Sequence, residues 1–405
     1  MIQNHAQSGD IVDLRQLPNK CGTAQSKITL SSGEIAINQD ELTLIGPEDA
    51  SELVTVSGSP TSRVFKQSGT GFLHIYSLAI TDGHYETSGK ARGGCIESQG
   101  QVYLLKSSVI GCTVSSTSQY AFGGGIDADS VRLMKSTVSG NEALVTSNHG
   151  FGGGISCNSL VAKYSSISNN IAHDGGVTFG FGGGAFVGSY AYIESSTVDY
   201  NTAGRGGGLK VAGGHGRIVN STISGNFADQ DFGAIESTGD YFGIFNSTIA
   251  LNYSTSGFAG PKGAVFFVGT TPGSALTLQS SIVAKNTAGS SHTPADIYLG
   301  YSYGGQQTLA GADNLVIASN AAMAPPGVIT IMSDPMLGPL GAHGGQTRTH
   351  IPLPGSPAIG AGNNNGLYQV EQRGRGYPRT SGAAAKVDIG AVQFDSIFFD
   401  DFEGN

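Results

Sequence analysis

Short apolar segments recur along most of this chain, and each carries a serine in its middle and an asparagine at its end. Six segments show the pattern most clearly: LMKSTVSGN, AKYSSISNN, IESSTVDYN, IVNSTISGN, IFNSTIALN and LQSSIVAKN. A glycine-rich tract precedes four of them, with the sequences FGGGID, FGGGIS, FGGGAF and RGGGLK. The closing asparagines are 25 to 34 residues apart, and a repeat of this length predicts a solenoid.

Apolar residues within each unit lie two residues apart, which puts their side chains on the same face of a strand. Each unit therefore reads as two or three short strands that point inward, as in one coil of a parallel β-helix. A serine column lies five residues before the closing position of each unit, and we place the following residues in it: Ser77, Ser107, Ser136, Ser165, Ser196, Ser221, Ser247 and Ser281. The predicted fold class is all-β, a single-stranded parallel β-helix of about 10 coils with an irregular C-terminal region.

We expect the repeated serines, asparagines and glycines to be structural. Eight stacked serines cannot all be nucleophiles, and none lies in a Gly-x-Ser-x-Gly context. Asparagine tolerates positive φ and bonds turn amides with its side chain, so it suits the turn that closes each unit. Stacked asparagines also hydrogen-bond to one another along such a column. The glycine tracts allow close backbone passage, and they lack the Lys-Ser/Thr of a phosphate-binding loop.

Composition agrees with this fold and excludes several function classes. The chain has 405 residues, of which 63 are glycine and 13% are charged, and it has no tryptophan. Such a composition suits short strands and tight turns better than helices. The formal net charge is -9 and no Lys/Arg-rich run occurs, so we expect no nucleic-acid partner. No apolar run approaches the roughly 20 residues that a membrane span requires.

The cysteines and histidines give no sign of a dedicated transition-metal site or of a cofactor. None of the four cysteines forms a C-x-x-C pair, and no H-x-x-x-H or H-E-x-x-H motif occurs. Cys95 and Cys112 fall within one unit and could bridge, although we expect buried thiols. Calcium remains open as a cation for paired carboxylates.

Changes in periodicity suggest three regions. Residues 1–60 contain short strand candidates at a closer spacing than the later repeat, and we interpret them as an N-terminal cap and first coil. Residues 61–333 form the parallel β-helix. Residues 334–405 are rich in Pro, Gly and Arg with little strand periodicity, and they form the C-terminal region and tail.

Several segments resemble a known group of proteins. The GGGI tract followed by STISGN resembles the repeats of right-handed parallel β-helix proteins that bacteria secrete, and the opening GDIVDLRQL…ITLSSGEIAI…LTLIGP is similar to their N-terminal region. The tail DPMLGPLGAHGGQTRTHIPLPGSPAIGAG…VDIGAVQF resembles the choice-of-anchor Q domain, which often precedes a surface-sorting signal. The final IFFDDFEGN resembles a short tail of secreted bacterial proteins.

The resemblance implies a right-handed coil and a secreted or bacterial cell-surface location. Met1 is not followed by a signal peptide, and we expect the numbering to begin at a mature or truncated start. The architecture hosts polysaccharide lyases, glycoside hydrolases, tailspikes and adhesins, so the activity has to be argued from a site.

One outward column is mixed and charged where the inward columns are uniform. It follows the inward apolar residue of each glycine-tract strand, and it contains Glu97, Asp127, Ser156, Phe186, Lys210, Glu236 and Phe266. In β-helices the neighbouring loops vary in length and carry binding function. We therefore expect the candidate site along this column.

The charged residues suggest three kinds of chemistry. Glu97 and Asp127 fall on adjacent coils about 5 Å apart, where two carboxylates share a proton, bind a cation or act as the nucleophile and acid of a retaining glycosidase. Lys210 and Arg205 would supply the base and the cation of a polysaccharide lyase. A simple ion pair between Lys210 and Glu236 is the plainer alternative.

A second column lies four residues before the inward apolar residue and contains Arg92, Phe122, Phe151, Phe181 and Arg205. Stacked phenylalanines could bind sugar rings, but we favour a packing role for them. His149 lies in a variable loop and is a weaker candidate for substrate binding.

Two function hypotheses follow. The chain is a secreted or surface protein that binds a polysaccharide and cleaves it with glycosidase-like or lyase-like chemistry, or it is a non-catalytic adhesin for a cell-surface glycan. The sequence shows no positive evidence for a third possibility, a passive spacer, and it leaves the substrate and the oligomeric state open.

Overall fold

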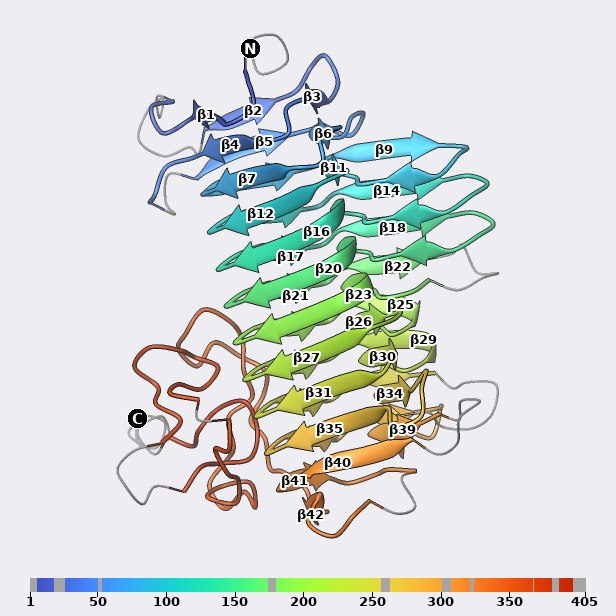
Figure 1. Cartoon of the computed structure of the whole chain (residues 1–405), viewed down its shortest axis with the longest axis vertical. Helices are drawn as coiled ribbons and strands as arrows, with labels where there is room; N and C mark the ends of the chain where they lie inside the picture. The colour runs from blue at the N-terminus through green and yellow to red at the C-terminus, as the bar shows by residue number, and fades with distance from the viewer. Residues whose placement is uncertain are drawn as a thin grey trace.

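The computed structural model shows one parallel β-solenoid of about 10 turns (Figure 1). The structure describes residues 6–17, 26–49, 53–173, 180–255, 263–300, 307–320, 324–366, 368–380 and 386–395. No helix occurs within these residues, and the predicted all-β fold class is confirmed. Cys21 and the final IFFDDFEGN lie outside the described residues.

The largest sheet has 18 strands and contains two ladders. The glycine-tract ladder includes β3 (Ile35–Ile37), β6 (Phe65–Gln67), β11 (Ile96–Ser98), β26 (Leu209–Val211), β30 (Ile235–Thr238), β34 (Val265–Val268) and β39 (Ile297–Leu299). The second ladder includes β1 (Asp10–Asp13), β4 (Leu42–Ile45), β7 (Phe72–Tyr76), β12 (Gln101–Leu105), β27 (His215–Val219), β31 (Tyr241–Phe245), β35 (Ala275–Gln279) and β40 (Thr308–Ala312). Three long strands run through both ladders: β16 (Ile126–Met134), β20 (Ile155–Lys163) and β23 (Ala185–Glu194).

A second sheet contains the residues that follow the serine column. Its 12 strands are β2 (Lys27–Thr29), β5 (Val54–Ser57), β8 (Leu78–Thr81), β13 (Ser108–Ile110), β17 (Thr137–Ser139), β21 (Ser166–Ser168), β24 (Thr197–Asp199), β28 (Thr222–Ser224), β32 (Thr248–Ala250), β36 (Ile282–Ala284), β41 (Asn314–Val316) and β42 (Ile329–Ile331).

A third face closes each turn. Its nine-stranded sheet contains β9 (His84–Thr87), β14 (Thr113–Ser116), β18 (Glu142–Val145), β22 (Ile171–His173), β25 (Thr202–Arg205), β29 (Phe227–Asp231), β33 (Tyr253–Ser254), β37 (Thr287–Ala288) and β38 (Thr293–Pro294). A three-stranded sheet contains β10 (Ala91–Arg92), β15 (Ala121–Phe122) and β19 (Gly150–Phe151). Among the named strands, only β37 and β38 pair antiparallel.

The core lies inside the solenoid and is built from ladders of like residues. In the glycine-tract ladder, Ile96, Ile126 and Ile155 are register partners, and all three are fully buried. Because adjacent turns are about 4.8 Å apart, each inward apolar column forms a continuous stack. This stack fixes the register, since a shift of one residue would turn the apolar set outward.

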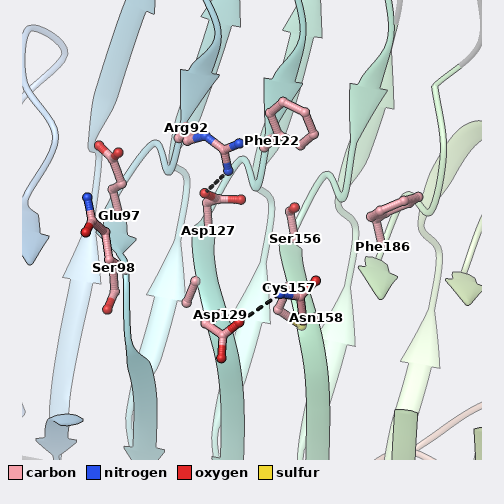
Figure 2. Close-up of a pocket in the computed structure, with 12 residues that line it drawn as sticks. Arg92, Glu97, Ser98, Phe122, Asp127, Asp129, Ser156, Cys157, Asn158 and Phe186 are labelled. Atoms are coloured by element: carbon pink, nitrogen blue, oxygen red, sulfur yellow. Dashed lines mark hydrogen bonds and ion pairs between the residues drawn. The ribbon is translucent and has the colours of Figure 1, made fainter. Parts of the chain in front are cut away.

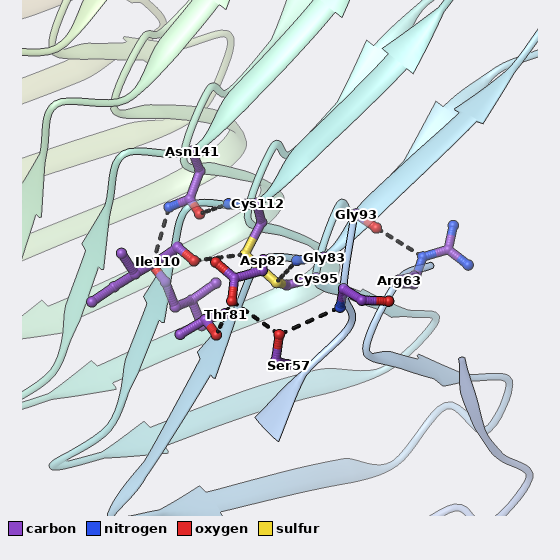
Figure 3. The surroundings of a disulfide bond; sticks show 12 residues. Ser57, Arg63, Thr81, Asp82, Gly83, Gly93, Cys95, Ile110, Cys112 and Asn141 are labelled. Atoms are coloured by element: carbon purple, nitrogen blue, oxygen red, sulfur yellow. Dashed lines mark hydrogen bonds between the residues drawn. A yellow bond between two sulfur atoms is a disulfide. The ribbon is translucent and has the colours of Figure 1, made fainter. Parts of the chain in front are cut away.

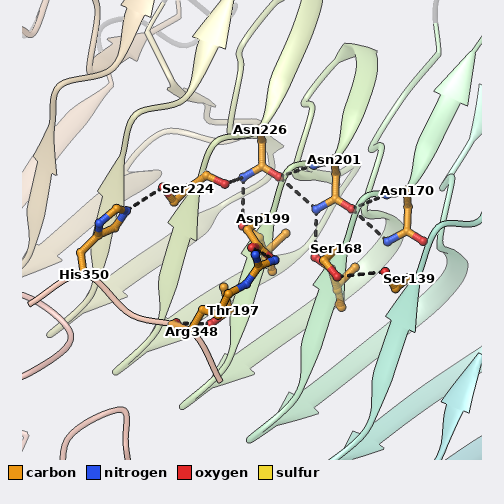
Figure 4. Close-up of polar contacts among 12 residues, drawn as sticks. Ser139, Ser168, Asn170, Thr197, Asp199, Asn201, Ser224, Asn226, Arg348 and His350 are labelled. Carbon is orange, nitrogen blue, oxygen red and sulfur yellow. Dashed lines mark hydrogen bonds and ion pairs between the residues drawn. The ribbon is translucent and has the colours of Figure 1, made fainter. Parts of the chain in front are cut away.

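The repeated serines and asparagines are structural, as predicted. The backbone N–H of Ser107 donates to the Ser136 hydroxyl at 3.2 Å, and the Ser136 hydroxyl donates to the Met134 carbonyl at 2.9 Å. The asparagines form a fully buried ladder in which Asn170 Nδ2 donates to Asn201 Oδ1 at 2.9 Å (Figure 4). The same bond links the other adjacent members of the column Asn141, Asn170, Asn201, Asn226, Asn252 and Asn286.

The ladder asparagines do not adopt the positive φ that we expected of them. Positive φ occurs at the residue before the asparagine, for example at Gly140, Asn169 and Tyr200, while the ladder asparagines keep negative φ. The column therefore depends on the side-chain amide. That amide accepts hydrogen bonds through oxygen and donates through nitrogen, so it joins the turns above and below.

The first unit was predicted one residue out of register. Leu78 N–H donates to the Ser107 hydroxyl at 3.2 Å, and Ile80 is the register partner of Val109. Ser77, which has positive φ, therefore lies outside the serine column. Its neighbour Leu78 occupies that position and follows Val54 in register, while Asn314 follows Ser281 at the other end, so the serines lie between two apolar residues and an asparagine.

Cys95 and Cys112 form a disulfide, so our expectation of buried thiols was wrong for this pair (Figure 3). Cys112 occupies the asparagine position of its turn, and its N–H donates to Asn141 Oδ1 at 3.0 Å. The disulfide thus begins the asparagine ladder, and Asp296 ends it by accepting from Asn286 Nδ2 at 2.9 Å. Cys157 is a buried free thiol.

Removing this disulfide is expected to weaken the N-terminal turns. The two cysteines are 17 residues apart, and a loop of this size contributes about 3 kcal/mol. We expect the double variant Cys95→Ser/Cys112→Ser to lower the urea midpoint, and a reductant to lower that of the wild type equally. The double variant should not respond to the reductant. Equal midpoints for the oxidised and reduced wild type would contradict the assignment.

The C-terminal region lies against the second sheet and forms only isolated bridges within its described residues (Figure 1). Arg379 is fully buried, and its guanidinium donates to Asn220 Oδ1 at 2.7 Å. Thr222 donates to Gln372 Oε1 at 2.6 Å, and His350 bonds the Ser224 hydroxyl at 2.8 Å (Figure 4). Buried polar contacts therefore hold the two parts together.

Candidate functional site

The outward column on the glycine-tract ladder has the predicted register. Glu97 pairs with Asp127, Asp127 with Ser156, and the column continues through Phe186, Lys210, Glu236 and Phe266. It also extends beyond the prediction, to Lys66 before Glu97 and Tyr298 after Phe266. The repeat therefore supplied a correct alignment of the candidate residues.

A pocket of about 540 Å³ opens at the start of this column (Figure 2). Strands β11, β16, β20 and β23 supply most of its wall, where the glycine-tract ladder bends into the second ladder. The lining residues are Arg92, Glu97, Ser98, Gln99, Phe122, Asp127, Ala128, Asp129, Ser156, Cys157, Asn158 and Phe186. Ala128 and Cys157 are small and buried, which leaves room between the polar side chains.

Asp127 is the most perturbed acid of this pocket. The residue is 6% exposed, and burial raises its pKa to about 6 against the opposing effect of Arg92. Arg92 Nη1 contacts an Asp127 carboxylate oxygen at 2.9 Å. A carboxyl group with this pKa is half protonated near pH 6, so it can deliver a proton under mildly acidic conditions.

Glu97 forms an ion pair with a second arginine, Arg63. Arg63 is 1% exposed, and its Nη2 contacts Glu97 at 2.9 Å while Lys66 lies 3.8 Å from the same carboxylate. Arg63 also donates to the carbonyls of Arg92 and Gly93 at 2.7 Å each. Arg63 therefore orients both Glu97 and the backbone of Arg92, the residue whose side chain is ion-paired with Asp127.

Sequence reasoning missed Arg63 because it precedes the regular repeat. It also missed Asp129 and Asn158, which lie two residues after Asp127 and Ser156 at the bend between the ladders. Asn158 Nδ2 donates to Asp129 Oδ1 at 2.8 Å (Figure 2). The same offset from Glu97 gives Gln99, so following the outward column two residues further would have revealed this polar row.

Lys210, Glu236 and Arg205 form a separate charged cluster further along the column. Lys210 Nζ and Arg205 Nη2 both contact Glu236 Oε1 at 2.7 Å. Glu236 is 2% exposed and Lys210 8% exposed, and burial lowers the pKa of Lys210 while Glu236 raises it. The plainer alternative, an ion pair between Lys210 and Glu236, is therefore present. Glu236 contacts both the base, Lys210, and the cation, Arg205, that a lyase would need.

The phenylalanine column is also formed. The ring centroids of Phe122 and Phe151 are 5.1 Å apart and those of Phe151 and Phe181 are 5.4 Å apart, with nearly parallel planes. Arg92 lies over Phe122 at 4.6 Å, and His149 packs edge-on against Phe181 at 5.5 Å. Such offset stacking stabilises the loops. The three rings are half-buried, and of the three only Phe122 lines the pocket, so the stack has the packing role that we favoured more than that of an open platform.

Three comparisons were made, with protein-family models, curated proteins and solved structures. None produced a match to this chain. The fold and the pocket are therefore the basis for any functional argument.

Within the part of the chain that the structure describes, no group of three or more His, Cys, Asp or Glu side chains is arranged to hold a metal ion. No helix in this part of the chain has the length and hydropathy needed to cross a membrane.

Proposed function

We propose that this protein binds a polysaccharide along the glycine-tract ladder and hydrolyses it in the pocket around Asp127. The observation that supports this most is a buried carboxyl group with a pKa of about 6 that lines an open pocket together with two further carboxylates, Glu97 and Asp129. Glycoside hydrolases use one carboxyl that remains protonated and a second that stays ionised.

The roles follow from the surroundings of each group. Asp127 is the general acid that protonates the oxygen of the leaving sugar, because burial favours its protonated form. Glu97, which is ion-paired with Arg63, is the second carboxylate, and it acts from the adjacent turn on the sugar or on a water molecule. We favour hydrolysis over lyase chemistry because Lys210 and Arg205 are both ion-paired with Glu236.

The direct test is incubation of the purified chain with a panel of neutral, amino-sugar and uronate polysaccharides between pH 5 and 8. Release of reducing ends without absorbance from an unsaturated product supports hydrolysis. Unsaturated product would instead indicate a lyase. Binding without either product would leave only the glycan-binding part of the proposal.

A non-catalytic surface adhesin is the second candidate. It is favoured by the ion pairs of Asp127, Glu97 and Glu236, since each carboxylate has a basic partner within 2.9 Å. Such pairs also occur where charge only stabilises the turns of a solenoid. Glycan binding that survives Asp127→Ala, with no product from the wild type, would favour this candidate.

A further inference from the structure

The charges that line the pocket are not balanced. Asp127 is paired with Arg92, and Glu97 with Arg63 and Lys66. Asp129 is exposed and receives a hydrogen bond from the Asn158 amide, and no basic side chain forms an ion pair with it among the described residues. The pocket therefore presents one carboxylate whose charge is not neutralised.

The position of this carboxylate is fixed by its neighbours. Asn158 lies on the next turn and holds one oxygen of Asp129 at 2.8 Å. Gly188, one turn further, makes space for Asn158, since a Cβ atom there would lie 2.8 Å from Asn158 Oδ1. The second oxygen of Asp129 remains available to a ligand. The row Asp129–Asn158 thus combines an anion with an amide at the mouth of the pocket.

These charges discriminate between classes of sugar. A uronate carboxylate would approach Asp129, Glu97 and Asp127, and the one lining cation, Arg92, is already bonded to Asp127. Like charges at this range repel, whereas an ammonium group would be attracted to Asp129. A neutral sugar would be accepted through its hydroxyl groups but would gain no ionic contact.

We propose that the pocket selects an amino-sugar unit, whose ammonium group pairs with Asp129, and disfavours uronates. The inference rests on the proposed function in that it takes the ligand to be a glycan. It goes further by naming the class of sugar and the residue that recognises it. Because Asp129 is exposed, the ionic contact is worth about a fivefold difference in affinity, and added salt should reduce it.

The test measures binding of three soluble hexamers, of glucosamine, glucose and galacturonic acid, by calorimetry at pH 6 in low and high salt. We expect the glucosamine hexamer to bind tightest and the galacturonic acid hexamer weakest. Asp129→Asn should remove the fivefold preference for glucosamine over glucose, so that these two hexamers bind with equal affinity. The matched control is Glu86→Gln, which removes one exposed carboxylate from β9, on the third face of the solenoid.

The outcomes separate this inference from the proposed function. If none of the hexamers binds, the glycan-binding proposal itself is overturned. If they bind but galacturonic acid is equal or tighter, or if Asp129→Asn leaves the preference intact, only the amino-sugar inference fails. An equal loss in Glu86→Gln would also overturn it, because the preference would then come from the overall negative charge.

Discussion

Replacing Asn201 by aspartate is expected to lower the free energy of unfolding by about 4 kcal/mol at pH 7. Asn201 Nδ2 donates to the Ile167 carbonyl and to Asn226 Oδ1, both at 2.9 Å. A carboxylate would face both of these acceptors with an oxygen, and it would bury a charge in a position with 0% exposure. The loss of two donors and the unpaired charge act in the same direction.

The charge makes this prediction specific. In the variant, burial should raise the pKa of the new carboxyl group above its unfolded value, so its destabilising effect is largest at neutral pH and shrinks as the pH falls. Asn201→Ala loses the hydrogen bonds without the charge and should show a smaller, pH-independent effect. Urea unfolding at pH 5 and pH 8 measures both. The control is Asn365→Asp on the exposed surface, which should change little.

The last position of the asparagine ladder, Asp296, shows where an aspartate fits. Asp296 accepts from Asn286 with one oxygen and from the backbone N–H groups of Ile317 and Ala318 with the other. An asparagine there would point its NH₂ at two donors. Inside the ladder each side chain must both accept from one neighbouring turn and donate to the other, whereas at the end it must only accept, so an amide is needed inside and a carboxylate suits the end.

The repeat made most of the fold predictable. Apolar residues two apart define the strands, and the serine and asparagine columns define the turns. The register partners of Glu97, Asp127 and Ser156 could therefore be predicted from the sequence. Our prediction for the first unit was one residue out of register because Leu78 occupies the position that serine has in the later units. The disulfide was misjudged because spacing brings Cys95 and Cys112 into one unit without showing that their side chains meet.

The candidate site was less predictable, because it depends on contacts between turns and outside the repeat. Arg63 lies in an irregular segment, yet it fixes Glu97 from the interior. Asp129 and Asn158 lie two residues beyond the predicted column, at the bend between the ladders, and the hydrogen bond that joins them across adjacent turns cannot be read from their spacing. Sequence reasoning gave the register of the candidate column, but the burial that distinguishes Asp127 from Glu97 could only be seen in three dimensions.

The second large effect is expected at Asp127. If the pocket hydrolyses glycans, Asp127→Asn should reduce kcat by a factor of about 10²–10⁴, because the amide cannot deliver a proton to the leaving sugar. Binding of the substrate should change much less, since the amide has nearly the same shape. The measurement is the initial rate of reducing-end release together with the dissociation constant of the same substrate.

The pH dependence provides an independent check of the same role. Because burial raises the pKa of Asp127 to about 6, the acid is protonated below that pH and loses its proton above it. The rate of the wild type should therefore fall about tenfold per pH unit above pH 6, and the residual rate of Asp127→Asn should lose this limb. The control Glu194→Gln changes a carboxylate that is ion-paired with Lys163 outside the pocket, and it should keep the wild-type profile.

A wild-type rate that is constant between pH 6 and 8, or a variant that retains full kcat, would rule out Asp127 as the acid. A catalytic centre would then have to be sought elsewhere along the column, beginning with the buried cluster around Glu236.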